Sequence, residues 1–401
     1  MQKITGVQQG STTGRIDELD VLRGFALLGV FIVHFVGSAY FELPLAEETA
    51  DRWFDEWPHF TALFVSDLFF QNKANTLFAT LFGMGFWVML TRLAERGANA
   101  TTIYVRRLLA LFVLGVLNVI FIFPGDVLHE YALIGLVLLL LRHWPLRAQL
   151  IVGLCLAFFG GPLVEHLFVA IDWSDDWFDK LQEAAFKDGG YGNWVATMSV
   201  AHFQRNFLMG GLLGWGLYIL GRFLLGTWLM RVNWVEWLRG RRVWLLRAAV
   251  SLSALGLTAE LVSLLIFYEI MPGPAWLDVT LHTLGAPILA AAYALLLVYW
   301  VQSSNTRGMV MWLAPVGKVA LTAYVLHGLV FTLCYMPFGL DLLGRAGPAI
   351  GLLMAVGLYV LLTILASLWL VRFRYGPLEF FWRWATYGAR PEFRRHNREP
   401  A

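Results

Sequence analysis

One apolar stretch of the chain carries a basic residue near its start and a histidine near its end. Arg23 and His34 both lie within residues 19–40, eleven positions apart. On an α-helix this spacing is about three turns, so the two side chains share one face, roughly 16 Å apart along the axis. Arginine pairs well with phosphate, and histidine is the commonest acid/base group near neutral pH. The pattern predicts a site that works across the membrane, with a basic group at one end of the helix and a possible acid/base at the other.

A run of polar residues interrupts a second apolar segment, residues 61–90. The run consists of Gln71, Asn72, Lys73, Asn75 and Thr76. It predicts a broken helix, and non-helical backbone at membrane depth must line a cavity or be buried in protein. We expect Lys73 either to form an ion pair with Asp67 or to meet an anionic ligand.

Two further pairs of ionisable residues have spacings that suit acid–base chemistry. His59 and Asp67 are eight positions apart, a little over two helical turns, so they can share a face. The alternative is an interfacial histidine and an aspartate bonded to a neighbouring helix. Asp126 and His129 open another apolar segment, where Asp126 is well placed to be the N-cap of a helix.

The composition of the chain is that of a membrane protein. The chain has 401 residues, of which 58% are hydrophobic and 14% charged. Such a chain has more apolar surface than a soluble domain can bury. Cys155 and Cys334 both lie in apolar runs, so neither a disulfide nor a metal cluster is implied. We expect no bound metal and no nucleic-acid partner.

Apolar segments long enough to cross a bilayer occur about ten times. They lie near 19–40, 61–90, 104–123, 126–142, 147–170, 195–221, 244–268, 279–301, 312–335 and 349–371. The loops between them alternate in charge, and basic loops stay in the cytoplasm. The basic set includes Arg92, Arg96, Arg142, Arg147, Arg222, Arg231, Arg307 and the tail after Arg372.

This alternation predicts an all-α, polytopic membrane helix bundle of about ten spans with both termini cytoplasmic. Residues 1–371 form a single transmembrane domain in this interpretation. Residues 372–401 form a cytoplasmic tail that begins with a helix in the membrane interface, with Pro377 in its first turn.

In this orientation most histidines lie on the extracytoplasmic side. They are His34, His59, His129, His166, His202 and His282. His327 lies near the middle of the membrane. Histidine tolerates interfaces well, so each alone could simply end a helix; His34 is the exception because it lies deeper and shares a face with Arg23.

Several motifs in fixed order resemble the YeiB-like family of bacterial inner-membrane proteins. They are Leu19-Asp20-x-Leu22-Arg23-Gly24-Phe25-Ala26, Lys73-x-x-x-Leu77-Phe78-x-x-Leu81-Phe82-Gly83-x-Gly85-Phe86, Gly125-Asp126-Val127-Leu128-x-x-Tyr131-Ala132, Gly317-Lys318-Val319-Ala320 and Arg374-Tyr375-Gly376-Pro377-Leu378-Glu379. That family in turn resembles a group of transmembrane acyltransferases, which includes heparan-glucosaminide N-acetyltransferase and the bacterial sugar O-acetylases. The resemblance implies transfer of an acyl group from cytoplasmic acyl-CoA, acetyl-CoA above all, to an extracytoplasmic sugar, lipid or small molecule.

The resemblance also suggests roles for residues. The sugar O-acetylases carry an arginine and a histidine in an early span, which Arg23 and His34 match; in other relatives the working histidine lies nearer the next span, which points to His59. The base is therefore His34 or His59. We expect Asp67 or Asp126 to orient the imidazole, and His129 to assist in acid–base catalysis. Asn72 or Lys73 would polarise the carbonyl group of the thioester. The residues expected to bind acyl-CoA are Arg23, Arg106, Arg107, Lys318 and His327.

The main alternative is a transporter or flippase of a lipid or small anionic solute, without covalent chemistry. A broken helix and buried charges suit such a protein equally well. A metal or haem site built from the outer histidines is a third interpretation, which no Cys/His spacing supports. The expected partners are membrane lipids, acyl-CoA and an unidentified acceptor, and the glycine-rich spans would permit a homodimer.

Overall fold

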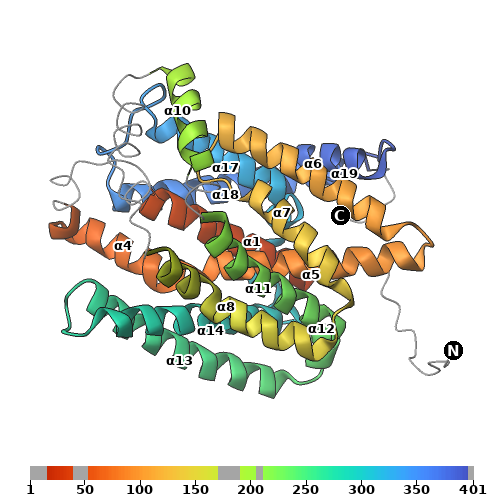
Figure 1. The fold of residues 1–401 in the computed structure, drawn as a ribbon, viewed down its shortest axis with the longest axis horizontal. Helices are drawn as coiled ribbons and strands as arrows, with labels where there is room; N and C mark the ends of the chain where they lie inside the picture. The colour runs from red at the N-terminus through yellow and green to blue at the C-terminus, as the bar shows by residue number, and fades with distance from the viewer. Residues whose placement is uncertain (1–15, 39–52, 170–189, 205–210, 396–401) are drawn as a thin grey trace.

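The computed structural model describes residues 16–38, 53–169, 190–204 and 211–395, without side-chain detail for 38, 161–169 and 211. Every named element in these residues is a helix, and Phe373 and Arg394 form an isolated β-bridge. The prediction of an all-α helix bundle is confirmed (Figure 1).

Seven helical spans in the described residues are long and apolar enough to cross a membrane. They are α1 (Asp17–Val33), α4 (Trp57–Phe69) together with α5 (Lys73–Glu95), α6 (Ala100–Phe121), α11 (Gly211–Arg231), α13 (Arg242–Phe267), α14 (Ala275–Val301) and α18 (Pro348–Arg372). The chain is therefore a multi-pass membrane protein, and the count of ten spans stays a prediction. The other helices of ten residues or more are α7 (Leu128–Leu140), α8 (Leu146–Val169), α10 (Tyr191–Phe203), α17 (Ala320–Tyr335) and α19 (Pro377–Tyr387).

The predicted span 195–221 includes residues 205–210, which lie outside the described residues, so it stays a prediction as a single span. Its described parts lie in α10 and α11, and α11 continues through Arg222 to Arg231. Arg222 thus lies in the middle of a helix, where we expected the start of a basic loop. The helix accommodates this charge because the guanidinium donates to the carbonyl oxygens of Ala157 and Tyr218 and lies over the Tyr218 ring.

The α1 helix occupies the centre of the bundle (Figure 1). It packs against α5, α14, α18 and the short helix α16 (Ala314–Lys318), and most of its side chains are buried or partly buried. The approach to α16 is very close, because a Cβ added to Gly317 would lie 1.9 Å from the carbonyl oxygen of Asp20. The α13 and α14 helices form an antiparallel pair at one edge. The site-bearing α1 is therefore held on all sides by other helices.

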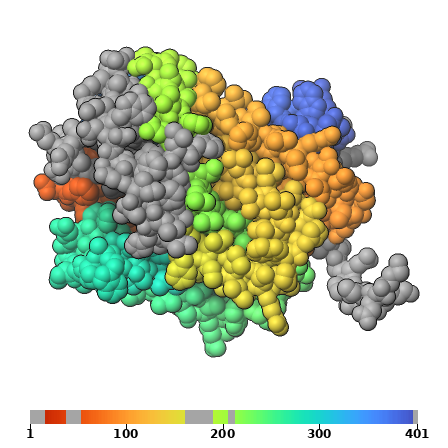
Figure 2. Space-filling view, in the orientation of Figure 1, coloured from red at the N-terminus to blue at the C-terminus, as the bar shows by residue number. Residues whose placement is uncertain are grey.

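The outer surface of the bundle is apolar, as contact with lipid requires. On the face shown in Figure 2, α6, α7 and α8 form a continuous stretch of surface. Exposed apolar side chains on these helices include Leu109, Val113, Phe121, Leu140, Ile151 and Phe159. Polar groups are instead gathered inside.

The predicted helix after the last span is confirmed as α19, with Pro377 at its first position. Glu379 in its first turn joins it to the start of α17. The Glu379 carboxylate accepts hydrogen bonds from the backbone N–H groups of Leu321 and Thr322, at 2.7 and 3.1 Å, and from the Thr322 hydroxyl at 2.6 Å. The carboxylate thus satisfies N–H groups that α17 leaves unpaired at its N-terminus.

Candidate functional site

A cavity of about 760 Å³ lies inside the bundle, among α1, the α4–α5 turn, α7, α11, α13 and α14. Its volume is typical of sites that bind small molecules. Ionisable side chains from six different segments reach its wall: His34, Asp67, Glu130, His202, Arg222 and His282.

His34 is the first residue of a π-helical turn, His34–Ser38, that continues α1. Such turns often occur at functional sites. Its Nδ1 lies 2.8 Å from Nε2 of His327, whose own Nδ1 lies 2.8 Å from the carbonyl oxygen of Tyr324. A carbonyl can only accept, so Nδ1 of His327 carries the proton and its Nε2 accepts one from Nδ1 of His34. Nε2 of His34 is therefore left as an unprotonated base on a residue that lines the cavity.

Aromatic rings hold this histidine pair in place. Phe31 stacks on His327 with ring centroids 4.5 Å apart, and Phe123 lies 4.9 Å from His34. His327 is wholly buried. The enclosure keeps water from the hydrogen bond between the two histidines and fixes the direction in which Nε2 of His34 points.

The predicted break in the second span is confirmed at Phe70–Asn72, between α4 and α5. Asn72 adopts a left-handed conformation with φ 60°, which lets the chain turn before α5 begins. Gln71, Asn72 and Asn75 line the cavity. The polar run thus supplies cavity wall, as expected for non-helical backbone at this depth.

The expected ion pair between Lys73 and Asp67 is not the one that forms. Lys73 is wholly buried and its Nζ pairs with the carboxylate of Glu260 on α13, while it contacts Asp67 only through a 2.7 Å hydrogen bond to the backbone carbonyl. The Asp67 carboxylate instead accepts a 2.6 Å hydrogen bond from Tyr268. Lys73 prefers Glu260 because α13 brings that carboxylate into the same dry interior.

The Lys73–Glu260 pair continues to the cavity through two polar side chains. His282 on α14 lies 3.1 Å from the Glu260 carboxylate through Nδ1, and its Nε2 lies 2.6 Å from Nδ2 of Asn72. His282 and Asn72 line the cavity. These contacts connect the Lys73–Glu260 ion pair with the turn between α4 and α5.

His59 occupies a different environment from His34. Its Nδ1 accepts a 3.2 Å hydrogen bond from the backbone N–H of Ala349, and its Nε2 lies 3.2 Å from the Glu56 carboxylate. One ring nitrogen is therefore engaged by the start of α18 and the other by the residue that precedes α4, and His59 is not among the residues that line the cavity. His59 and Asp67 bind different partners, although their spacing allowed a shared face.

Asp126 lies one residue before the N-cap of α7, which is Val127. The expectation that Asp126 itself is the N-cap is wrong by one position. Its carboxylate accepts hydrogen bonds from the backbone N–H of Leu128 at 3.1 Å and from Asn118 at 2.9 Å. It therefore fixes the loop that leads into α7, and His34 is oriented by His327 rather than by Asp126 or Asp67.

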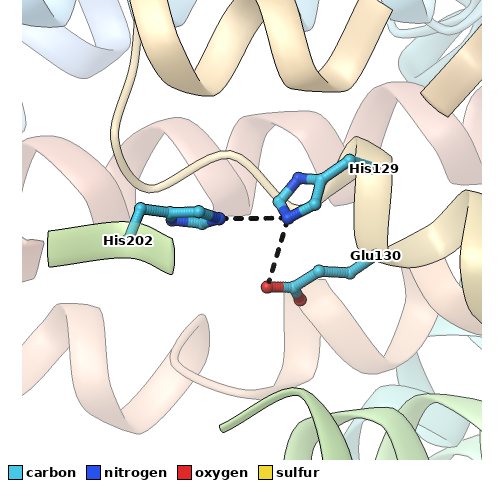
Figure 3. Close-up of side chains that lie close together, drawn as sticks. All are labelled: His129, Glu130 and His202. Carbon is cyan, nitrogen blue, oxygen red and sulfur yellow. Dashed lines mark hydrogen bonds and ion pairs between the residues drawn. The ribbon is translucent and has the colours of Figure 1, made fainter. Parts of the chain in front are cut away.

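Three ionisable side chains meet where α7 approaches α10 (Figure 3). His129 Nε2 lies 3.0 Å from His202 Nε2 and 3.9 Å from a carboxylate oxygen of Glu130. One ligand atom from each lies within 4.8 Å of the others, so this group is the one in the described residues that could hold a metal ion. A tetrahedral zinc site would need these atoms about 3.3 Å apart, so Glu130 would have to move toward the histidines.

The basic residues expected to bind phosphate lie away from the cavity wall. Arg107 lies 3.5 Å from the centre of the Trp382 ring on α19, and both Arg23 and Arg383 are near enough to repel its charge. Arg23 also pairs with Asp20 at 3.2 Å. Arg106 is exposed on α6, and Lys318 ends α16.

Sequence reasoning missed Glu260, His202, His282 and Arg222 as parts of the site. Glu260 had a usable signal, because it is the one acid inside the apolar segment 244–268. The side chain of His166 lies outside the described residues.

The architecture defines a class: a multi-pass helical membrane protein whose spans enclose a cavity lined by ionisable groups. Comparison with known sequences identifies the family. The chain is 30% identical to YeiB of Escherichia coli (strain K12) over 390 residues, which cover 92% of this chain and 96% of YeiB, and it belongs to the YeiB-like family.

Two further relatives match at similar length. YxaH of Bacillus subtilis (strain 168) is 29% identical over 404 residues, covering 96% of this chain and 97% of YxaH. A 39.9 kDa protein from the amylase 3' region of Bacillus acidopullulyticus is 26% identical over 374 residues, covering 93% and 94%. A family model described as "Protein of unknown function (DUF418)" matches residues 229–389.

Proposed function

We propose that the protein is an acyltransferase of a bacterial inner membrane, which moves an acyl group from cytoplasmic acyl-CoA to a hydroxyl or amine on the other side. The observation that carries the proposal is the hydrogen-bonded chain from Tyr324 through His327 to His34, which leaves Nε2 of His34 free to accept a proton at the cavity. The resemblance of Arg23 and His34 to the paired residues of the sugar O-acetylases supports the same chemistry.

In the proposed reaction, the acceptor oxygen or nitrogen attacks the carbonyl carbon of the thioester while its proton passes to Nε2 of His34. The new C–O or C–N bond forms, the C–S bond breaks, and the departing sulfur takes the proton back. His34 is thereby regenerated. Its Nδ1–H donates to His327 throughout, so the pair keeps one hydrogen bond in every step.

The phosphates of acyl-CoA are assigned to the arginines near α19. Arg23 and Arg383 both repel the charge of Arg107, and a bound phosphate would relieve this repulsion. Arg23 lies roughly 16 Å from His34 along α1, a distance that the flexible arm of acyl-CoA would bridge. Asn72, which lines the cavity, is the better candidate to polarise the thioester, because Lys73 is committed to Glu260.

The orientation follows from the charge of the loops. Basic residues concentrate at the loops on the Arg23 side, and such loops stay in the cytoplasm. Both termini would then be cytoplasmic, acyl-CoA would bind from the cytoplasm, and the His34 end of the cavity would face the acceptor outside.

The test is turnover of acetyl-CoA by detergent-purified protein, with release of free thiol as the readout and water standing in for the acceptor. His34→Ala and His59→Ala form a matched pair, since both remove a histidine but only His34 lines the cavity. We expect His34→Ala to abolish thiol release and His59→Ala to preserve it.

Two outcomes would contradict the proposal. Thiol release that survives both substitutions would show that neither His34 nor His59 is the general base. Saturable binding of acetyl-CoA without thiol release would favour a transporter, for which the broken helix beside the cavity is also suited.

A further inference from the structure

A buried arginine faces the cavity with no negative partner among the residues that the structure describes. Arg222 lies in the middle of α11 with 1% of its surface exposed, and it lines the cavity. Its partners are all neutral: Nε donates to the Thr76 hydroxyl at 3.0 Å, and Nη1 donates to the carbonyl oxygens of Ala157 and Tyr218 at 3.1 and 3.0 Å. In the described part of the chain no carboxylate pairs with it.

This arrangement differs from the other deeply buried cation of the site. Lys73 is paired with Glu260, so its charge is compensated inside the protein. A cation taken from water into a membrane interior is costly unless an anion accompanies it. The Tyr218 ring, 3.1 Å below the guanidinium, compensates only part of this cost.

A second donor without a partner in the described residues lines the same cavity. The Nδ2 group of Asn75 is buried with no hydrogen-bond partner among the described residues, while its Oδ1 accepts a 3.0 Å hydrogen bond from Tyr131. Asn75 lines the cavity and immediately precedes Thr76, the residue that holds Nε of Arg222. The Nη2 group of Arg222 also lacks a partner in these residues.

The acids of the cavity wall do not supply the missing charge. Asp67 accepts from Tyr268, Asp126 accepts from Asn118, and Asp278 accepts from Ser263 at 2.5 Å. Each is held by its own donors. Glu130, the fourth acid of the wall, lies 3.9 Å from His129 Nε2, and no ion pair in the described residues joins it to Arg222. The charge that Arg222 lacks must then come from whatever occupies the cavity.

We propose that Arg222 and Asn75 form an oxyanion subsite, so that the compound bound in this cavity carries a carboxylate or phosphate group. Arginine presents a planar fork of N–H donors that fits such groups. The Asn75 amide adds a neutral donor on the wall of the same cavity. The subsite is independent of acyl transfer, because a transported compound would meet the same donors.

The test measures the melting temperature of the full-length protein in detergent. The probes are inorganic phosphate, acetate and short-chain phosphatidylglycerol, with chloride at equal ionic strength as the reference. We expect at least one probe to raise the melting temperature in a saturable way, since a ligand that binds only the folded state stabilises it. A response to phosphate or acetate indicates a soluble anion, and a response to the lipid alone indicates a headgroup.

Three variants make the test specific. Arg222→Gln should abolish the shift. Arg231→Gln should retain it, because Arg231 lies on the same helix but donates to Trp144 outside the cavity wall. Asn75→Asp supplies the missing negative charge, so it should raise the melting temperature without ligand and abolish the response to anions.

The inference fails if no probe shifts the wild-type protein, or if Arg222→Gln responds as the wild type does. If Arg222→Gln does not fold, Asn75→Asp is the deciding variant. A melting temperature below that of the wild type, together with an unchanged response to anions, would overturn the proposal. Anion binding without turnover of acetyl-CoA would leave the subsite standing and remove only the acyltransferase.

Discussion

His34 on α1 and His327 on α17 are 293 residues apart in the chain and share a hydrogen bond of 2.8 Å. The Tyr324 carbonyl fixes the proton on Nδ1 of His327, and this in turn fixes the proton on Nδ1 of His34. In a triad with aspartate, the carboxylate both orients the imidazole and stabilises its charged form. His327 is a neutral histidine in the position of that aspartate, so it orients the imidazole of His34 but supplies no negative charge to stabilise the protonated form.

His34→Ala should lower the turnover of acetyl-CoA by at least about 10²-fold, because general acid–base catalysis contributes roughly 10²–10⁴-fold. His327→Ala should lower kcat less and leave KM nearly unchanged, since it removes only the group that orients His34. Steady-state thiol release measures both. His327→Gln offers an amide oxygen that can accept from His34 and should recover part of the rate; equal loss in both His327 variants would contradict the orienting role.

The contact between α19 and α17 should weaken as pH rises. Burial raises the pKa of the Glu379 carboxyl above its usual 4.5. The folded state then keeps a proton that the unfolded state has lost, so stability falls as pH rises from about 4.5 through the raised pKa. Hydrogen exchange of the α19 amides, corrected for intrinsic rates, measures this. Glu379→Gln cannot ionise and should show no such slope, whereas wild-type protection that increases with pH would contradict the prediction.

The crossing of α5 and α11 should not tolerate a methyl group. A Cβ added to Gly83 would lie 2.2 Å from the Phe223 carbonyl oxygen, and one added to Gly226 would lie 2.0 Å from that of Thr80. Gly83→Ala and Gly226→Ala should each lower the melting temperature by forcing the helices apart. Gly357→Ala on α18 is the control, because nothing lies within 4 Å of its added Cβ. It should be neutral or stabilising by about 0.5–1 kcal/mol; a similar loss in all three would refute the close-contact explanation.

Local patterns predicted those parts of the fold that depend on local chemistry. The break at Asn72 was predictable because polar residues cannot continue a lipid-facing helix, and α19 was predictable from Pro377 and the residues after it. The extent of α11 was not, because Arg222 resembles the start of a basic loop until its buried carbonyl partners are known.

The partners within the site depend on which spans are neighbours, and no local pattern fixes that. Lys73 had Asp67 as its nearest acid in sequence, yet its charge partner lies 187 residues away on α13. His34 likewise meets a histidine from α17. The types of residue in the site could therefore be predicted, whereas their pairing required the packed bundle.

Removing either charge of the Lys73–Glu260 pair should destabilise the protein strongly, because both side chains are wholly buried. Breaking a buried pair typically costs about 3–5 kcal/mol, so Glu260→Gln should lower the melting temperature markedly. Replacing both residues by methionine removes both charges together and should recover most of the loss. Glu236→Gln is the control, because the side chain of Glu236 is 70% exposed and that of its partner Arg239 is 59% exposed. Such an exposed ion pair should contribute less than about 1 kcal/mol to the free energy of unfolding. A double variant as unstable as Glu260→Gln would show that the two residues act separately.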